Sequence, residues 1–299
     1  MTDLSAKRIA AAAGQIDPVF RDTPQFVSEQ LSARFVREVM VKVETLNPIG
    51  SFKGRGTSLL AQQLDPMRTW VCSTAGNFGQ GLAYSARRRK AEVHAFVSPA
   101  VPSAKVANMR SLGARVEVSE RPEADARTHA AASDDRFLVI DGLHPEIAEG
   151  AGTIGIELGA ADQIDTAIVQ LGDGALISGI ACWLKSVSPE VRIVGVCASG
   201  APAMARSFAA GRVICTEDTD TIATALAITE PIAESLARVV ALVDEVILVD
   251  DDDLRTAVDL VAESLGVLVE PAGAAGVAAL LSHEELEGHR VLVLLTGAA

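Results

Sequence analysis

Thr69-Trp-Val-Cys-Ser-Thr-Ala-Gly-Asn-Phe-Gly-Gln-Gly81 decides the fold of this chain, because it passes from a strand pattern through a glycine-rich turn into a helix pattern. Thr69–Cys72 is a short apolar run, and Gln80–Arg89 carries apolar residues at helical spacing. A short buried strand that leads directly into a helix is the unit of a parallel sheet with helices on its faces. This stretch therefore predicts an α/β fold.

The same alternation of strand and helix patterns continues along the whole chain. Further short apolar runs that predict strands are Val39–Val43, Val93–Val97, Arg115–Val118, Phe137–Ile140, Thr166–Gln170, Arg192–Val196, Glu245–Val249 and Val291–Leu295. The helical patterns between them are Ala104–Ser111, Leu176–Ser186, Asp253–Leu265 and Gly273–Leu281. Together they predict an open, doubly wound α/β architecture with mainly parallel strands, and the length of 299 residues suggests two domains.

The charge and composition of the chain exclude several classes of partner. Asp and Glu number 39 against 26 Lys and Arg, which leaves a net charge of −13. A protein that binds nucleic acid needs clustered Lys and Arg for the phosphates, and a single-strand binder also needs aromatic platforms. Aromatic residues are only 4% here, so we expect no nucleic-acid partner. An anionic ligand must then be bound by backbone amides or by a few placed cations.

Membrane and metal partners are not expected either. No apolar run approaches the ~18 to 20 residues that a membrane-spanning helix requires, and the first residues lack the pattern of a signal peptide. The four cysteines are scattered without zinc-site spacing, and they are Cys72, Cys182, Cys197 and Cys215. We therefore expect reduced thiols and a cytoplasmic protein.

Glycine clusters at three predicted strand-to-helix junctions indicate a ligand cleft. They lie at Cys72–Gly81, Leu171–Gly179 and Glu270–Gly273. Ligands in open α/β sheets bind outside the carboxyl ends of the strands, and helix N-termini there offer N–H groups to anions. One cluster alone would indicate only a tight turn. Because neither the G-x-G-x-x-G pattern nor a P-loop lysine follows any strand, the ligand is expected to carry a smaller phosphate than a nucleotide does.

The segment Asn47-Pro-Ile-Gly-Ser-Phe-Lys-Gly-Arg-Gly56 adds a candidate catalytic lysine. By itself the segment predicts a turn followed by the start of a helix, with Lys53 as an ordinary surface charge. Next to a phosphate site, however, a single amine is what a Schiff-base cofactor requires. The segment therefore makes Lys53 the first candidate for covalent chemistry.

Seven motifs, taken in order, resemble one known family. They are Asp22-Thr-Pro24, Ser51-Phe-Lys-Gly-Arg-Gly56, Ser73-Thr-Ala-Gly-Asn-Phe-Gly-Gln-Gly81, Ala148-Glu-Gly-Ala-Gly-Thr-Ile-Gly-Ile-Glu157, Gly172-Asp-Gly-Ala-Leu176, Glu270-Pro-Ala-Gly273 and Thr296-Gly297. The family is the fold type II pyridoxal-phosphate enzymes, the tryptophan synthase β family, and the chain is most similar to its serine/threonine dehydratases. The resemblance implies two open twisted α/β domains with the cofactor in the cleft between them. Residues 1–67 and 143–299 would form the large domain, and residues 68–142 the small, mobile, carboxylate-binding domain.

The resemblance also implies a role for each matching residue. Lys53 would bind pyridoxal 5'-phosphate covalently and then remove the α-proton of the substrate, while Phe52 would pack beside the ring and Asn77 would hydrogen-bond the ring oxygen. Thr296 would face the pyridine nitrogen. The phosphate would be bound around Gly172, Asp173, Gly174, Ala175 and Leu176. The substrate carboxylate would be bound by the amides of Thr74, Ala75, Gly76 and Asn77.

The chain departs from the family pattern at several of these positions. Asp173 and Ala175 replace glycines, and a carboxylate beside a phosphate dianion is unfavourable unless its side chain points away. Ala75 stands where serine racemases carry a second catalytic serine, which disfavours racemisation. Cys197 and Ala198 replace the Glu-Pro of metal-binding relatives, so no divalent cation is expected.

The expected function is a lyase that removes water and ammonia from a β-hydroxy amino acid such as threonine or serine. A neutral hydroxyl at Thr296 favours β-elimination or β-replacement, because it leaves the pyridine nitrogen largely unprotonated. A replacement transferase similar to threonine or cysteine synthases remains an alternative, for which Arg55 is the obvious candidate cation for a substrate phosphate. A non-catalytic pyridoxal-phosphate-binding relative is a remote alternative. The family suggests a homodimer, and the chain's end soon after Thr296 suggests that no regulatory domain follows.

Two further interpretations concern polar residues outside the main motifs. Glu270 either lines the cleft or only orients its turn. The five histidines show no metal-site pairing and are interpreted as surface or capping residues; they are His94, His129, His144, His283 and His289.

Overall fold

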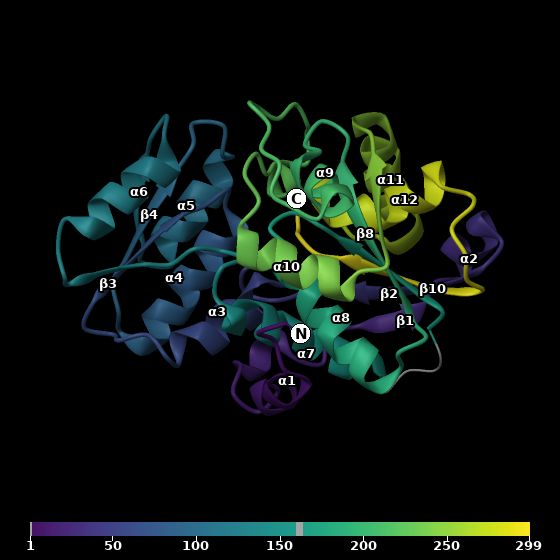
Figure 1. The fold of residues 1–299 in the computed structure, drawn as a ribbon, viewed down its shortest axis with the longest axis horizontal. Helices are drawn as coiled ribbons and strands as arrows, with labels where there is room; N and C mark the ends of the chain where they lie inside the picture. The colour runs from purple at the N-terminus through teal and green to yellow at the C-terminus, as the bar shows by residue number, and fades with distance from the viewer. Residues whose placement is uncertain (1, 160–163) are drawn as a thin grey trace.

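The computed structural model describes residues 2–159 and 164–299 and contains two sheets. The larger sheet has the strand order β1-β2-β10-β7-β8-β9, and only β1 runs antiparallel to its neighbour. The smaller sheet has the order β5-β4-β3-β6 and is parallel throughout. In Figure 1 the smaller sheet and its helices form a separate lobe beside the larger sheet, drawn in blue and teal.

The elements alternate as strand and helix through most of the chain. The strands are β1 Gln25–Val27, β2 Glu38–Val43, β3 Thr69–Ser73, β4 Val93–Val97, β5 Arg115–Val118, β6 Arg136–Leu138, β7 Thr166–Gln170, β8 Arg192–Ala198, β9 Glu245–Val249 and β10 Arg290–Leu295. The helices are α1 Ala6–Ala12, α2 Glu29–Phe35, α3 Lys53–Ala61, α4 Asn77–Arg89, α5 Ser103–Ser111, α6 Pro122–Ala131, α7 Pro145–Gly159, α8 Ala175–Val187, α9 Ala203–Ala210, α10 Ala233–Leu242, α11 Asp251–Leu265 and α12 Ala275–Ser282. Short 3₁₀ turns are η1 Pro18–Phe20, η2 Thr224–Leu226 and η3 Pro271–Ala274.

The predicted fold class is confirmed, since every expected strand is present and the sheets are mainly parallel. The expected strand Phe137–Ile140 is shifted, because β6 spans Arg136–Leu138. The antiparallel edge strand β1 was not expected. It has three residues, too few to show a period of two, and it pairs with β2 over Gln25–Val27.

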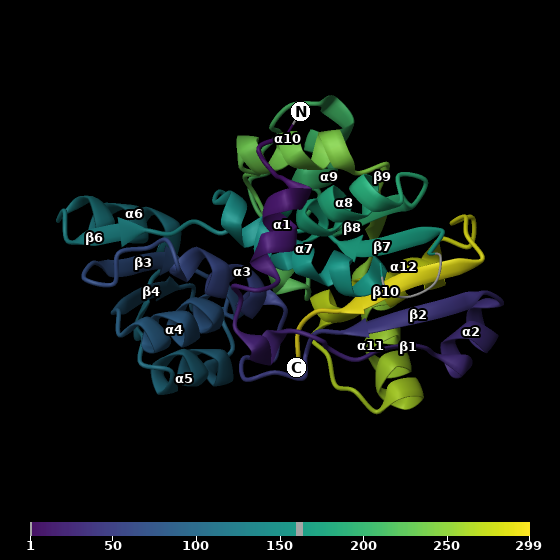
Figure 2. The same cartoon turned by 90° about the horizontal axis from the view of Figure 1, so that it is seen from below.

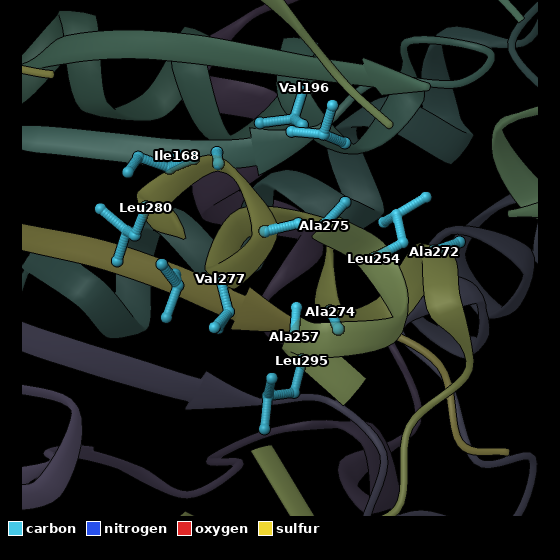
Figure 3. Packing of buried hydrophobic residues seen from close by; sticks show 14 of the residues in the cluster. Ile168, Val196, Leu254, Ala257, Ala272, Ala274, Ala275, Val277, Leu280 and Leu295 are labelled. Atoms are coloured by element: carbon cyan, nitrogen blue, oxygen red, sulfur yellow. The ribbon is translucent and has the colours of Figure 1, made fainter. Parts of the chain in front are cut away.

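One face of the larger sheet is covered by α11 and α12, which form a core of small and branched side chains. Figure 3 shows Val277 and Leu280 of α12 beside Ile168 of β7 and Leu295 of β10. The alanines of α12 let the helix lie close to the strands. A Cβ atom at Gly276 would lie 3.2 Å from the carbonyl oxygen of Ile168, so glycine is the residue that fits this contact without displacement.

The other face of the larger sheet is covered by a tight stack of helices that includes α3, α7 and α8, and Figure 2 shows α1 beside α7. A Cβ atom at Gly179 would lie 1.9 Å from the carbonyl oxygen of Ala148, and one at Gly56 would lie 2.5 Å from that of Ile147. These glycines are therefore required because helix backbones cross at contact distance. Gly179 belongs to this packing, although the sequence placed it in a ligand-binding cluster.

The interpretation of His94 as a surface or capping residue is wrong. His94 lies within β4 and is only 3% exposed. Its Nδ1 atom is 2.9 Å from Nε2 of His129, which lies on α6 and packs on the same side of the smaller sheet. All five residues of β4 are buried, so the strand shows no alternation that would indicate whether its histidine lies inside or outside, and this explains the error.

Among the described residues, no helix has both the length and the apolar character that crossing a membrane requires.

Candidate active site

A cavity of about 580 Å³ lies where the carboxyl ends of β3, β6, β7 and β10 converge, between the two sheets. This is the place where open parallel sheets bind their ligands. The structure brings to its wall nearly every candidate site residue of the sequence: Phe52, Lys53, Thr74, Ala75, Gly76, Asn77, Gly172, Asp173, Gly174, Leu176 and Thr296. Ala175 is buried behind this wall and does not line the cavity.

Asn47 shapes the turn that delivers Lys53 to the cavity. Its Oδ1 atom accepts the N–H of Ile49 at 3.1 Å, and its Nδ2 atom donates to the carbonyl oxygen of Ser51 at 3.0 Å. The N–H of Phe52 then donates to the carbonyl oxygen of Thr296, which follows β10, at 3.2 Å. Lys53 is therefore the first residue of α3 and begins the helix at the carboxyl end of the larger sheet.

Arg55, also on α3, anchors this helix through buried ion pairs and does not line the cavity. Its guanidinium is fully buried, with Nε 2.8 Å from Glu44 Oε2 and Nη1 2.6 Å from Glu157 Oε1. Burial opposes its charge, but the two carboxylates outweigh burial and raise the pKa of Arg55. Arg55 is therefore a structural residue, and its candidacy as a ligand for a substrate phosphate is wrong.

The amine of Lys53 lies between two carboxylates and two aromatic rings. Its Nζ atom is 2.6 Å from Asp141 Oδ2 and 2.8 Å from Asp173 Oδ2. The same atom is 4.9 Å from the ring centre of Phe52 and 6.0 Å from that of Phe78. Only 11% of the Lys53 side chain is exposed, so the amine is held within the wall of the cavity.

The three charged groups shift one another's pKa in opposite directions. Burial disfavours the charge of Lys53, but Asp141 and Asp173 outweigh it and raise the lysine's pKa. Burial and the neighbouring carboxylate of Asp173 raise the pKa of Asp141 to about 7. Burial also tends to raise the pKa of Asp173, but Lys53 and the N–H of Ala175 outweigh burial and lower this pKa. Asp173 is therefore the ionised member of the pair, and Asp141 is the one that takes up a proton.

A phosphate would be compatible with Asp173 only if its side chain pointed away from the cavity, but the side chain points toward it. Its Oδ2 atom faces Lys53, while its Oδ1 atom accepts the N–H of Ala175 at 2.8 Å. The carboxylate thus accepts a hydrogen bond from one of the amides at the N-terminus of α8, which were expected to bind phosphate. Gly174 precedes this helix with φ of +95°, a conformation in which other residues are strained.

The asparagine loop after β3 is organised by the hydroxyl of Thr74, which accepts the N–H groups of Gly76 and Gly79, each at 3.0 Å. The N–H of Thr74 itself donates to the carbonyl oxygen of Phe96. Two of the four amides expected to bind a carboxylate are therefore engaged. Among the described residues, the N–H groups of Ala75 and Asn77 have no such partner and remain available to an anion.

Glu270 lines the cavity and binds two side chains that follow strands of the smaller sheet, which decides between its two interpretations. Its Oε1 atom accepts a hydrogen bond from Asn77 Nδ2 at 2.8 Å, and its other oxygen pairs with the amine of Lys105 on α5. Both side chains of the ion pair are largely buried. The carboxylate therefore holds the asparagine loop and α5 against the larger sheet.

The sequence reasoning missed Asp141 and Lys105. Asp141 follows the predicted strand Phe137–Ile140 directly, and Lys105 lies in the first turn of the helix after β4. Residues just after parallel strands gather at one edge of a sheet, so their positions were a usable signal. Their pairing with Lys53 and with Glu270 was not visible, because it joins residues 88 and 165 positions apart.

The residues at this wall fit pyridoxal phosphate, the cofactor that the resemblance implies. The Lys53 amine can bond to its aldehyde, and the first-turn amides of α8 lack carbonyl partners within the helix and can donate to a phosphate. Thr296 and Asn77 offer a hydroxyl and an amide for the ring. Asp173 opposes the phosphate, because its carboxylate holds the Ala175 amide and carries a like charge.

Comparisons with known proteins agree with this arrangement. Residues 16–297 match the family model described as "Pyridoxal-phosphate dependent enzyme". The chain is 34% identical to phenylserine dehydratase of Ralstonia pickettii, over 99% of this chain and 93% of the relative. It is 31% identical to threonine dehydratase 1 biosynthetic, chloroplastic, of Solanum lycopersicum, over 96% of this chain.

The chain spans about half (49%) the length of the tomato enzyme. Among solved structures, maize serine racemase is similar, with a TM-score of 0.87 and 29% identity, over 99% of this chain and 93% of that chain. The likeness thus extends over the whole chain and includes the cavity wall. From its fold, its cavity and these relatives, the chain belongs to the pyridoxal-phosphate-dependent enzymes of fold type II.

Proposed function

We propose that this enzyme is a lyase that removes water and ammonia from a β-hydroxy amino acid and releases a 2-oxo acid. The observation that carries the proposal is the amine of Lys53, buried at the wall beside an acid, Asp141, in the same cavity that Ala75 and Asn77 line. Two relatives are named threonine dehydratase and phenylserine dehydratase, and this supports the proposal of a dehydratase reaction. When bound, pyridoxal phosphate supplies the electron sink that weakens the bonds to the α-carbon.

The candidate residues at the wall have proposed parts in this reaction. Lys53 binds the cofactor and, as a neutral amine, accepts the α-proton. The amides of Ala75 and Asn77 bind and orient the substrate carboxylate, and the N-terminus of α8 binds the phosphate. The Thr296 hydroxyl, which lines the cavity, would offer the ring nitrogen a neutral partner and would favour elimination over transamination.

An apolar stretch of the cavity wall supports a substrate with an apolar group on its β-carbon. Leu226, Ile228 and Pro231 line the cavity within one short segment, in which Thr229 and Glu230 also line it. A methyl or phenyl group can bury its surface there, which serine cannot, and each buried methylene contributes about 0.8 kcal/mol. We therefore propose that threonine-like and phenylserine-like substrates are preferred over serine.

The alternatives are less well supported by the residues at the wall. Racemisation in the manner of serine racemase would use a second acid-base residue at position 75, where this chain has alanine. A replacement transferase acting on a phosphorylated substrate needs cations at the wall, but Arg55 is buried away from the cavity and Lys105 is paired with Glu270. Among the described residues, this leaves Lys53 and the exposed Arg127. A non-catalytic relative would have no need of Lys53 beside an acid.

We also propose that residues 68–142 form the small domain and close over the substrate once its carboxylate is bound. This segment contains all four strands of the smaller sheet and both free amides. A homodimer in the cytoplasm is proposed from the family resemblance. Light scattering of the purified protein tests the dimer, since one chain has a mass of 31.2 kDa.

The function is tested with purified protein loaded with pyridoxal phosphate. Wild-type protein is expected to show the absorbance of the lysine-bound cofactor and to convert threonine or phenylserine to the oxo acid and ammonia. Lys53→Ala is expected to lose both. An unreactive but loaded wild-type protein would favour the non-catalytic relative, and a long-lived intermediate that waits for a nucleophile would favour the transferase.

A further inference from the structure

Asp141 is a second carboxyl group on the reactive lysine, and the reaction described so far leaves it without a task. It follows β6 in the loop that leads to α7, and its Oδ2 atom is 2.6 Å from Lys53 Nζ. Its Oδ1 atom is buried and, among the described residues, receives no hydrogen bond. The carboxyl group lines the cavity, and 21% of its side chain is exposed there.

The surroundings of Asp141 favour its protonated form. The neighbouring Asp173 is stabilised as an anion by Lys53 and by the N–H of Ala175, whereas Asp141 has only the lysine. Two carboxylates this close to each other cannot both ionise at low cost, so the one with fewer hydrogen-bond donors takes up a proton. Burial and Asp173 accordingly raise the pKa of Asp141 to about 7.

The loop that carries Asp141 is held in place from outside the cavity. Arg238 on α10 donates to the carbonyl oxygens of Gly142 and Leu143, each at 2.8 Å, and pairs with Asp3 at 2.7 Å. Arg238 is 1% exposed, so these bonds are shielded from water. The position of Asp141 is therefore preorganised by residues that do not themselves reach the cavity.

A buried acid beside the lysine meets a requirement of the proposed reaction, and this inference rests on that proposed function. Hydroxide is a poor leaving group, so the β-oxygen needs a proton as its bond to carbon breaks. We propose that Asp141 is a catalytic acid that donates this proton to the β-hydroxyl of the substrate. The C–O electron pair leaves with the oxygen, which departs as water.

The protons balance over one turnover. Lys53, as a neutral amine, takes the α-proton and becomes an ammonium, while Asp141 gives its proton to the leaving oxygen and becomes a carboxylate. The products are then an ion pair across the 2.6 Å contact. Return of the proton from Lys53 Nζ to Asp141 Oδ2 restores both groups, and neither an oxidant nor a reductant is needed.

Two substrates that differ only in the leaving group test the proposal. Threonine must lose its hydroxyl with a proton, whereas 2-amino-3-chlorobutanoate loses chloride without one, and both yield 2-oxobutanoate and ammonia. In Asp141→Asn we expect turnover of threonine to fall by about 100-fold or more, with turnover of the chloro compound within about fivefold of wild type. Cofactor content, measured by absorbance and by borohydride trapping on Lys53, is expected to equal that of wild type.

Asp173→Asn is the companion variant, because Asp173 contacts the same amine and its charge raises the pKa of Asp141. Without that charge Asp141 is protonated less often, so turnover of threonine is expected to fall more than turnover of the chloro compound, but less than in Asp141→Asn. Should Asp141→Asn fail to fold, Asp141→Glu, which keeps the acid but displaces it, is expected to raise the ratio of chloride to hydroxyl elimination.

Two results would overturn the role of Asp141. One is an equal loss of both reactions in the Asp141 variants, and the other is loss of cofactor, which would make Asp141 a binding residue. A wild-type enzyme that eliminates chloride but never dehydrates threonine would instead overturn the proposed function, and this inference with it.

Discussion

Asn77 Nδ2 donates a hydrogen bond of 2.8 Å to Glu270 Oε1, and this bond joins the first residue of α4 to the residue before η3. The two residues are 193 positions apart: Asn77 follows β3 of the smaller sheet, whereas Glu270 donates its N–H to Gly297, which follows β10 of the larger sheet. Lys105 pairs with the other oxygen of the same carboxylate. The orientation of the asparagine that is proposed to contact the cofactor ring thus depends on one glutamate that lies beside the larger sheet.

Removing this carboxylate is therefore expected to disturb the asparagine loop. In Glu270→Ala we expect kcat/KM for threonine to fall by about 100-fold, because a misplacement of about 1 Å has an effect of that size. Glu270→Gln keeps an oxygen for Asn77 but loses the charge for Lys105, and it is expected to stay within about tenfold of wild type. Steady-state kinetics check both variants, and equal losses would show that the Lys105 pair matters rather than the Asn77 bond.

Asp173→Gly is expected to strengthen cofactor binding. The carboxylate holds the Ala175 amide and places a negative charge where the phosphate dianion is proposed to bind. Removing the carboxylate makes one N–H available and removes one repulsion. We expect this to lower the Kd for pyridoxal phosphate by about tenfold, or about 1.4 kcal/mol. Titration of the cofactor-free protein with pyridoxal phosphate, followed by absorbance, measures this change. A higher Kd would contradict this prediction and would mean that Asp173 favours cofactor binding through its contact with Lys53.

Arg55→Ala is expected to lower the free energy of unfolding by about 3 to 5 kcal/mol, because it leaves the buried carboxylate of Glu44 without a cation and leaves Glu157 with Lys42 alone. Urea denaturation of the two proteins measures the difference. Arg255→Ala is the control, since Arg255 pairs with Asp252 on the surface and its loss is expected to change stability by less than about 1 kcal/mol. Similar values for the two variants would contradict the structural role of Arg55.

His94 is expected to make stability depend on pH. Burial lowers its pKa below the ordinary value of 6.5, with further contributions from His129 and Arg115. The unfolded chain therefore binds a proton at a higher pH than the folded protein does. The contribution of His94 to stability is therefore fully present above the ordinary pKa, and it is lost as the pH falls from there through the lower pKa of the folded protein.

The comparison is made between urea midpoints at about pH 7.5 and about pH 5.5. His94→Gln is expected to show a smaller drop than wild type, whereas His289→Gln, at an exposed position, is expected to show the same drop as wild type. His129 and His144 also have lowered pKa values, so part of the drop is expected to persist in His94→Gln. An unchanged drop in His94→Gln would contradict the assignment.

The alternation of strand and helix patterns, with a glycine cluster at three junctions, was enough to predict the α/β class and most element positions. Segments such as Thr166–Gln170 are apolar throughout because both faces of the sheet are covered, and this pattern is local in the sequence. The order of the motifs around Lys53 and Asn77 was enough to identify the family and its cofactor. These features depend on residues within a few turns of one another.

The contacts of the cavity depend on more than local sequence. Asp141 and Asp173 reach the same amine from 88 and 120 positions away, and Lys105 meets Glu270 across the two sheets. The order of strands in each sheet decides which loops converge, and side-chain rotamers then decide whether Asp173 points toward Lys53 or away from it. The sequence by itself therefore determined the fold class, the family and the lysine, whereas the tertiary structure decided which acids surround it, because charges interact through space rather than along the chain.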